Sequence, residues 1–179
     1  MENFLEKKEI LLSKNITPAS FQSKDGLFLS LSWITNCRAS DVLNIRNADH
    51  VLRSLGNQEK ITLENHSKFI MQYSQDNRLD FIIKENIHNN YIGGVNLVKT
   101  NIGWEIGKYI GNKNFEKRGI AKRATQSFIR FISEEFKFIS RIYSKTKIKN
   151  INNIKLNEIL GFRKERVLDE EFILMKKIL

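Results

Sequence analysis

The sequence is poor in the residues that build disulfide or metal scaffolds. Its 179 residues include one cysteine and three histidines. The single cysteine, Cys37, excludes an internal disulfide and a cysteine-rich metal centre, and with three scattered histidines we expect no bound metal. The His and Asn pattern of a thiol enzyme does not accompany Cys37. We therefore interpret this residue as a small buried apolar side chain and not as a nucleophile.

Long apolar runs and linkers are missing too. No stretch approaches the roughly 20 apolar residues of a membrane span. The opening residues, MENFLEKKEI, lack the basic start and apolar core of a signal peptide. The one proline, and the lack of repeats or segments rich in Gly or Ser, leave no candidate linker. With 41% apolar and 28% charged residues, the composition predicts a cytoplasmic protein with one globular domain.

Lysine and arginine together outnumber the acidic residues, and the formal net charge is +10. A basic surplus attracts nucleic acid, anionic membranes or phosphorylated small ligands. An AT-rich genome would enrich Lys, Asn and Ile without any such partner. The stripe of basic and aromatic residues typical of nucleic-acid modules is absent. We expect neither nucleic acid nor membrane as a partner, and the charge leaves room for a phosphate-rich small molecule.

The apolar periodicity predicts a mixed α+β domain. A polar patch over 14–25 separates a short N-terminal helix from the rest, so we predict an N-terminal extension over 1–24 and the main domain over 25–179. The elements expected within that domain are a strand over 26–33, a helical face over 42–55 broken near 47–49, a helix over 62–73, strands over 80–84, 91–99 and 103–110, a long amphipathic helix from 120, a strand over 138–146, a helix over 150–160 and a last strand over 171–177.

The segment Lys117–Ala121 (KRGIA) joins a predicted strand to the long helix. The first amides of a helix have no partner within it and favour anions, and a glycine lets a phosphate approach the backbone. The two cations would add charge-assisted contacts. The segment predicts a cradle for a pyrophosphate, with a basic loop capped by a glycine as the alternative.

Together with the residues that follow it, this segment resembles the GNAT acetyltransferase superfamily. The family's cradle reads Gln/Arg-x-x-Gly-x-Gly/Ala, and its next helix reads Asn-x-x-Ser and ends in Gly-Phe. The cradle window here is Glu116–Ala121 (EKRGIA), which keeps the Gly and Ala but begins with an acid. The later helix keeps Asn150 and Gly161-Phe162, and Asn153 replaces the serine. The resemblance extends from residue 26 to the C-terminus and is strongest from residue 92.

The resemblance implies a GNAT fold, a mixed and mostly antiparallel sheet splayed at its centre and flanked by helices. It implies acetyl-CoA as cosubstrate, with the pantetheine arm in the splay against the strand over 103–110. The residues expected to contact acetyl-CoA are Tyr109, Ile110, Lys117, Arg118, Gly119, Ile120, Ala121, Asn150 and Asn157.

Glu105, on the same strand, is the candidate base for direct attack by a primary amine, because a carboxylate facing the splay can take the amine's proton. A surface glutamate paired with a lysine is the alternative. Many family members place a tyrosine four residues before the Gly of Gly-Phe, as an acid for the departing thiolate. Asn157 stands there and is not a useful acid. This leaves water, Tyr109 or an unassisted departure.

The acceptor half contains Ile45-Arg46-Asn47, then a helix with an acidic residue and a histidine over 62–70, then Ile92-Gly93-Gly94-Val95. This order resembles GNAT enzymes that act on nucleotide-linked amino sugars in the pseudaminic acid pathway. That resemblance implies contacts to the nucleotide or sugar from Arg46, Asn47 and His66, a pocket wall at Phe69, and a phosphate contact at Lys99. A guanidinium can hold a phosphate through two hydrogen bonds. The alternatives are a cation at a helix end for Arg46, a surface side chain for His66 and a core residue for Phe69.

Two other functions stay open at this stage. One is acetylation of a protein N-terminus, as in ribosomal-protein acetyltransferases, although a chain of net charge +10 suits a cationic peptide poorly. The other is a domain that binds CoA without catalysis, as the departures at Glu116 and Asn157 would allow. The sequence does not decide the oligomeric state, and a homodimer stays open.

Overall fold

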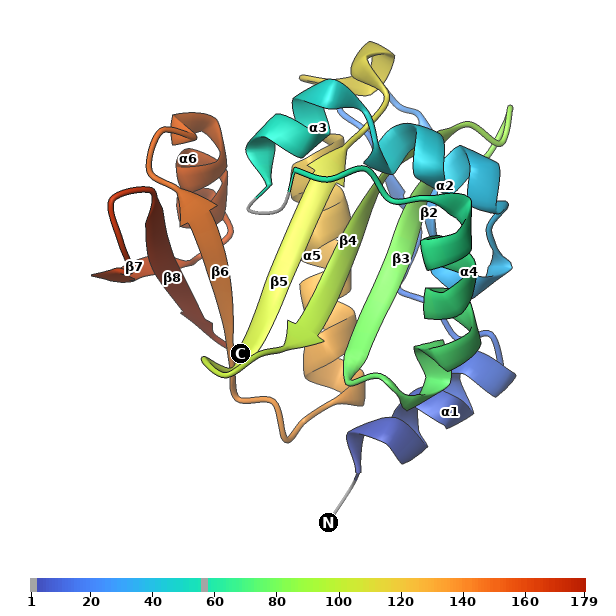
Figure 1. Cartoon of the computed structure of the whole chain (residues 1–179), viewed down its shortest axis with the longest axis horizontal. Coiled ribbons are helices and arrows are strands. Elements are labelled where there is room, and N and C mark those ends of the chain that lie inside the picture. The colour runs from blue at the N-terminus through green and yellow to red at the C-terminus, as the bar shows by residue number, and fades with distance from the viewer. Residues whose placement is uncertain (1–2, 56–57) are drawn as a thin grey trace.

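An eight-stranded sheet with the order β1-β2-β3-β4-β5-β6-β8-β7 runs through the computed structural model, which describes residues 3–55 and 58–179 (Figure 1). The elements, with η for short 3₁₀ helices, are α1 (Phe4–Ser13), β1 (Phe21–Gln22), β2 (Phe28–Trp33), η1 (Ile34–Asn36), α2 (Ala39–Arg46), α3 (Asp49–Ser54), α4 (Leu63–Gln72), η2 (Tyr73–Gln75), β3 (Arg78–Glu85), β4 (Tyr91–Lys99), β5 (Trp104–Ile110), η3 (Lys113–Phe115), α5 (Ile120–Glu135), β6 (Arg141–Lys147), α6 (Ile151–Ile159), β7 (Arg163–Val167) and β8 (Phe172–Ile178).

The sheet is antiparallel except where β5 meets β6. These two strands run parallel and share one paired position, Glu105 with Tyr143, whereas β4 and β5 pair over seven positions. Beyond the shared pair β5 and β6 diverge, as Figure 1 shows above the C-terminus. The predicted mixed, mostly antiparallel sheet with a central splay is therefore confirmed.

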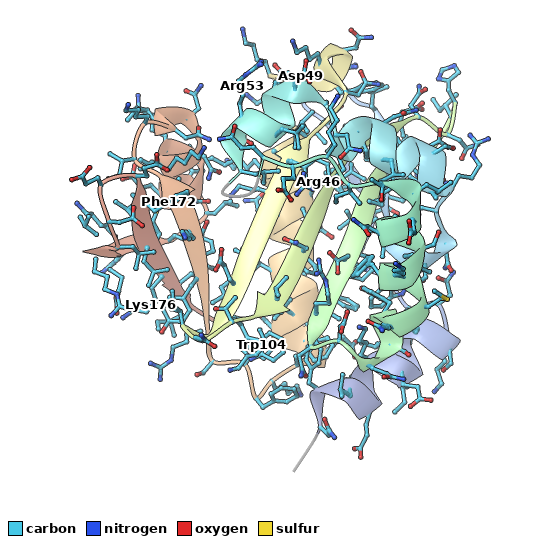
Figure 2. All side chains as sticks on the ribbon, viewed as in Figure 1. Arg46, Asp49, Arg53, Trp104, Phe172 and Lys176 are labelled. Carbon is cyan, nitrogen blue, oxygen red and sulfur yellow. The ribbon has the colours of Figure 1, made fainter. Side chains whose placement is uncertain are left out.

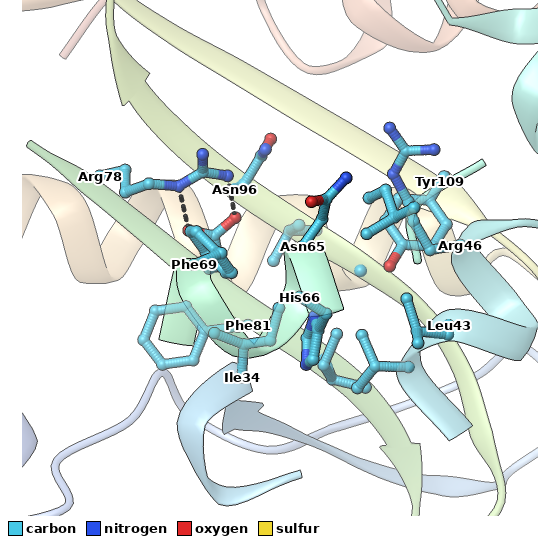
Figure 3. A pocket seen from close by; sticks show the side chains of 16 residues that line it. Ile34, Leu43, Arg46, Asn65, His66, Phe69, Arg78, Phe81, Asn96 and Tyr109 are labelled. Atoms are coloured by element: carbon cyan, nitrogen blue, oxygen red, sulfur yellow. Dashed lines mark hydrogen bonds and ion pairs between the residues drawn. The ribbon is translucent and has the colours of Figure 1, made fainter. Parts of the chain in front are cut away.

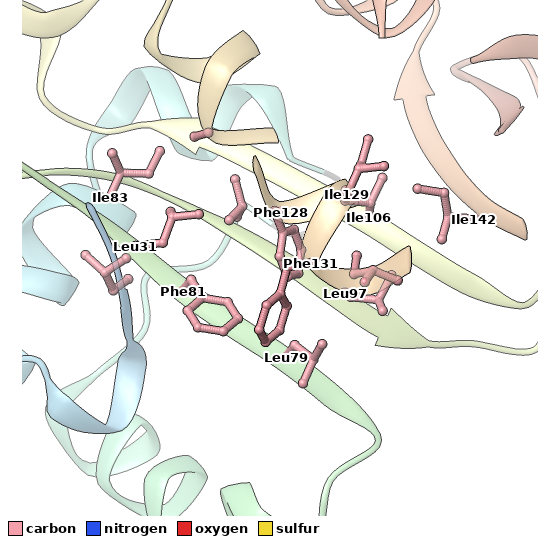
Figure 4. Packing of buried hydrophobic residues seen from close by; sticks show 14 of the residues in the cluster. Leu31, Leu79, Phe81, Ile83, Leu97, Ile106, Phe128, Ile129, Phe131 and Ile142 are labelled. Atoms are coloured by element: carbon pink, nitrogen blue, oxygen red, sulfur yellow. The ribbon is translucent and has the colours of Figure 1, made fainter. Parts of the chain in front are cut away.

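Helices cover both faces of the sheet. α5 lies behind β4 and β5 in Figure 1, and α2 and α4 lie on the opposite face. Aromatic and branched side chains of α5 pack on β3, β4 and β5 (Figure 4). The buried residues of this layer include Phe81, Leu97, Ile106, Phe128, Ile129, Phe131 and Ile132. The amphipathic spacing from residue 120 thus defines the main core, as predicted.

The N-terminal segment packs into the same core. Phe4 lies 4.4 Å from the ring of Trp104 and 5.0 Å from that of Phe136, measured between centroids. The indole Nε1 of Trp33 donates to the carbonyl of Ile16 at 3.0 Å. The described part of 1–24 is therefore continuous with the domain that follows, and the predicted boundary at residues 24–25 stays a prediction.

Two strands were not predicted. β1 has only two residues, too few for any periodicity. β7 reads RKERV, and all five of its residues are exposed, so it carries none of the apolar alternation that marks a half-buried strand. The start of one strand also differs from the prediction. β6 begins at Arg141 and not at 138, because Phe138 belongs to the turn after α5.

Candidate functional site

A cavity of about 670 Å³ occupies the splay between β5 and β6. One wall is β5 from Glu105 to Ile110, and the other comes from β6 and α6. Because β5 and β6 share a single paired position, the facing edge of β5 offers backbone groups without a strand partner. Such groups require hydrogen bonds from another source. An extended ligand that carries amides, as the pantetheine arm of CoA does, fits this edge as an added strand.

The N-terminus of α5 borders this cavity through Ala121. Gly119, just before the helix, has a φ of 74°, a left-handed conformation that glycine adopts without a steric penalty. A Cβ at this position would lie 2.9 Å from Cγ of Lys24. Ile120 is buried in the core. Free amides at the start of a 16-residue helix suit a phosphate group.

The two predicted cradle cations, Lys117 and Arg118, do not point into the cavity in this structure. Arg118 forms an ion pair with Asp25, with Nε 2.6 Å from Oδ2. That contact lowers the pKa of the Asp25 carboxyl to about 2. Lys117 is exposed. Neither side chain lines the cavity, so their contacts to phosphate stay predictions.

Glu116, the acid at the first position of the cradle window, faces His50 of α3. Nε2 of His50 lies 3.5 Å from the Glu116 carboxylate and 2.9 Å from the carbonyl oxygen of Ile110. A carbonyl only accepts, so Nε2 of His50 carries the hydrogen. Both side chains line the cavity. The structure thus gives the unexpected acid a partner that the sequence did not indicate.

Glu105 lines the cavity at the position where β5 and β6 still pair. Burial raises the pKa of its carboxyl, and the charge and backbone amide of Lys145 on β6 partly oppose this. A carboxylate with a raised pKa is a better proton acceptor near neutral pH. Its place in the cavity suits the predicted base.

Asn157 is fully buried, and neighbouring side chains form hydrogen bonds with its amide group. Its Oδ1 accepts from Nζ of Lys108 at 2.5 Å. Its Nδ2 donates to the hydroxyls of Ser144 and Thr146, both at 3.1 Å. Asn157 is not among the residues that line the cavity, so its contact with CoA stays a prediction. Asn150 lines the cavity, and its Oδ1 accepts from the amide of Asn153 at the start of α6.

A second cavity, of about 360 Å³, lies on the face that α2 and α4 cover (Figure 3). Arg46, His66 and Phe69 line it, as the acceptor prediction requires. Arg46 lies in front of the central strands (Figure 2). One of its guanidinium nitrogens, Nη1, is buried and has no hydrogen-bond partner among the described residues. The guanidinium lies 5.9 Å from the ring centroid of Tyr109.

The other titratable side chains that line this second cavity are either neutral or already in an ion pair. Arg78 and Asp80 form two hydrogen bonds of 2.7 and 2.6 Å, drawn in Figure 3. Asp80 is the one acid among the described residues that line this cavity. Burial lowers the pKa of His66, which favours the neutral ring at pH 7. The free cation of the cavity is therefore Arg46, within the described residues.

Two predicted acceptor residues do not line the cavity. The side chain of Asn47 donates to the carbonyl of Ile61 at 2.8 Å and accepts from its amide at 2.9 Å. This pair of bonds ties the end of α2 to the segment before α4. Lys99 lies at the far end of β4, 5.2 Å from the ring centroid of Trp104.

The two cavities meet at Asn96 and Tyr109, which line both. Gly107 makes room for this junction, because a Cβ there would lie 2.3 Å from Oδ1 of Asn96. The sequence reasoning missed Asn96. Its signal is the pairing of β4 with β5, which places Asn96 opposite Gly107. The arrangement allows two ligands to meet at the face of β4 and β5.

A family model described as an acetyltransferase (GNAT) domain matches residues 29–163. The chain belongs to the GNAT acetyltransferase family. No curated protein matches it. Within the described residues of this GNAT chain, no helix could cross a membrane, and no group of His, Cys, Asp or Glu is placed to hold a metal ion.

Solved structures show the same fold. The GNAT domain of S. lividans PAT is 15% identical, with 90% of this chain and 97% of that chain covered at a TM-score of 0.76. Spermidine N-acetyltransferase from Vibrio cholerae, in complex with CoA and spermine, is 16% identical, with 84% and 95% covered at 0.72. Campylobacter jejuni N-acetyltransferase PseH is 18% identical, with 84% and 97% covered at 0.63. At these identities the likeness shows the fold and leaves the acceptor open.

Proposed function

We propose that this GNAT protein transfers an acetyl group from acetyl-CoA to a primary amine of an anionic acceptor, namely a nucleotide-linked amino sugar. The observation that carries the proposal is the half-buried Arg46, whose guanidinium nitrogen Nη1 is buried and has no partner among the described residues. A buried donor without a partner costs about 1–3 kcal/mol. A diphosphate or carboxylate on the acceptor would supply the missing hydrogen bonds.

Cationic acceptors suit this cavity less well. A polyamine or a peptide N-terminus would need free carboxylates, and Asp80 already pairs with Arg78 at 2.6 Å. Arg46 would repel such an acceptor. The apolar ring of Phe69 and the neutral His66 give a sugar or base a flat, partly apolar wall. A ring of this kind commonly packs against the apolar face of a ligand.

The proposed chemistry needs a neutral amine at the junction of the two cavities. Acetyl-CoA supplies an activated thioester when bound in the splay. Glu105 accepts a proton from the amine, directly or through a water molecule. Asn96 and Tyr109 line both cavities, and we infer that they orient the acceptor at this junction. Because both ligands can be held together, the transfer proceeds by direct attack, without an acylated side chain.

The acceptor assignment is tested with a panel of purified amines and acetyl-CoA, scored by release of the CoA thiol. The panel contains UDP-, GDP- and dTDP-linked amino sugars, spermine and short peptides with free N-termini. We expect turnover with at least one sugar nucleotide and little with spermine or peptides. Efficient turnover of peptides or spermine, with none of a sugar nucleotide, would refute the acceptor assignment.

A further inference from the structure

Lys108 is a lysine on the core-facing side of a strand. Side chains alternate along β5, and Ile106, two residues earlier, is buried in the core. The residue paired with Lys108 on β4 is the buried Val95. Lys108 is itself mostly buried, and it lines the cavity in the splay. Glu105 has the opposite parity along β5, so the two side chains leave the strand on opposite faces.

Asn157 fixes the direction of this lysine. Both hydrogens of the Asn157 amide are used, because Nδ2 donates to Ser144 and Thr146 at 3.1 Å. The amide oxygen is left facing Lys108, whose Nζ donates to it at 2.5 Å. An ammonium group has three hydrogens. Among the described residues Asn157 is the one acceptor that Lys108 contacts, which leaves further hydrogens for a ligand in the cavity.

The surroundings of Lys108 ease the loss of its proton. Burial lowers the pKa of the Lys108 ammonium to about 8. The other titratable groups that line the same cavity are Glu105 and Tyr109 on β5, Lys145 on β6, His50 on α3 and Glu116 before α5. A thiol has an ordinary pKa of about 8.5. A donor and an acceptor of similar pKa exchange a proton with little free-energy cost, which favours general acid catalysis.

We propose that Lys108 is the general acid that protonates the departing CoA thiolate, and that Asn157 positions it. As the carbon–sulfur bond of the thioester breaks, its electron pair stays on sulfur, and one N–H proton of Lys108 passes to that sulfur. The neutral Lys108 amine regains a proton through water, equivalent to the one that Glu105 takes from the attacking amine. The products are the amide and the CoA thiol.

Tyr109, the side chain that the sequence analysis left open as a proton donor, is less suitable. Its ring lies over Gly94, where a Cβ would approach the ring and hydroxyl within 3.0 Å. Burial raises the pKa of its phenol, which makes it a weaker acid. The assignment of Lys108 rests on the acetyl-transfer step of the proposed function and does not depend on which amine accepts the acetyl group.

The first test uses CoA alone, so it is independent of the acceptor. The thiolate of CoA absorbs in the ultraviolet, and its titration is followed in the complex. With the wild-type protein, the Lys108 ammonium should lower the apparent thiol pKa by about one unit. Lys108→Met should abolish this shift while CoA still binds, and the exposed Lys155→Met on α6 should behave as wild type. Equal thiol titration in wild type and Lys108→Met, with CoA bound to both, would overturn the proposal.

The second test separates proton donation from charge. Lys108→Arg keeps a cation that cannot give up its proton. In the wild type the acid form of Lys108 is lost as the pH rises through its pKa of about 8, so the rate should fall there. Lys108→Arg should retain the lowered thiol pKa but reduce kcat about 10²-fold or more, and its rate should not fall near pH 8. Asn157→Asp places a negative charge beside the Lys108 ammonium and raises its pKa, so the fall in rate should move to higher pH by about one unit or more. An Asn157→Asp profile that matches wild type would remove the positioning role, and a fully active Lys108→Arg would remove the acid.

Discussion

Replacing Arg46 by methionine should have two opposed effects, and their combination identifies its role. Nη1 of Arg46 is buried without a partner among the described residues. Removing such a group relieves a penalty of about 1–3 kcal/mol, and methionine fills irregular apolar space well. The unliganded Arg46→Met protein should therefore be more stable than wild type. In the complex the same guanidinium supplies a charge-assisted bond of about 1.5–3 kcal/mol. Its loss should raise the acceptor KM about 10- to 100-fold.

Both effects are measured on one preparation. Urea unfolding without ligand gives the stability, and initial rates of CoA release against the best sugar nucleotide give KM. Arg38→Met is the matched control, because Arg38 lies just before α2 with 79% of its side chain exposed. It should leave the acceptor KM unchanged and lower the stability by about 1 kcal/mol at most, through the loss of its exposed ion pair with Asp41. An Arg46→Met protein with a wild-type acceptor KM would refute the proposed contact, and one with lowered stability would refute the argument from the unpaired nitrogen.

Three further substitutions, one of them with a matched control, test the remaining parts of the site. Glu105→Gln should lower kcat about 10²–10⁴-fold with unchanged acetyl-CoA affinity. Because the base must be ionised and burial raises its pKa, the wild-type rate should fall as the pH drops through that raised pKa, and a variant that keeps this limb would contradict the role. Gly119→Ala should cost about 1–2 kcal/mol of stability and weaken CoA binding by calorimetry. Gly161→Ala, at a φ of 88°, should cost stability alone, and equal CoA affinity in both would argue against the cradle. Asn47→Ala should lower stability by about 1–3 kcal/mol through the lost bonds to Ile61, and a raised acceptor KM at unchanged stability would show a contact to substrate instead.

The elements with strong periodicity could be predicted from the sequence. α5 shows its apolar face at helical spacing, and β3, β4 and β5 stand out between turns rich in Asn and Gly. The interruption of the helical face near residues 47–49 also matches the break between α2 and α3. β7 could not be predicted in this way. It is an exposed, charged edge strand that depends on pairing with β8, and pairing across the chain leaves no local pattern.

The cavity in the splay followed from the family resemblance, but the partners of its side chains did not. A motif aligns positions and says nothing of what each side chain contacts. Asn157 therefore looked free to reach CoA until the structure placed it against Lys108. Lys108 itself had a readable signal: it shares strand parity with Trp104 and Ile106, and a lysine on an otherwise apolar face needs an explanation.

The N-terminal segment has a consequence for the energetics of cosubstrate binding. The amide of Lys24 donates to the carbonyl of Arg118 at 3.1 Å, Asp25 pairs with the Arg118 side chain, and Ser127 of α5 donates to the carbonyl of Ala19 at 2.6 Å. The two contacts to Arg118 hold the loop before α5, and the bond from Ser127 ties α5 itself to the N-terminal segment. A loop held in one conformation before a ligand arrives loses less conformational entropy on binding, so more of the contact energy appears as affinity. The first residues of the chain would then help to set the strength of CoA binding without touching the ligand.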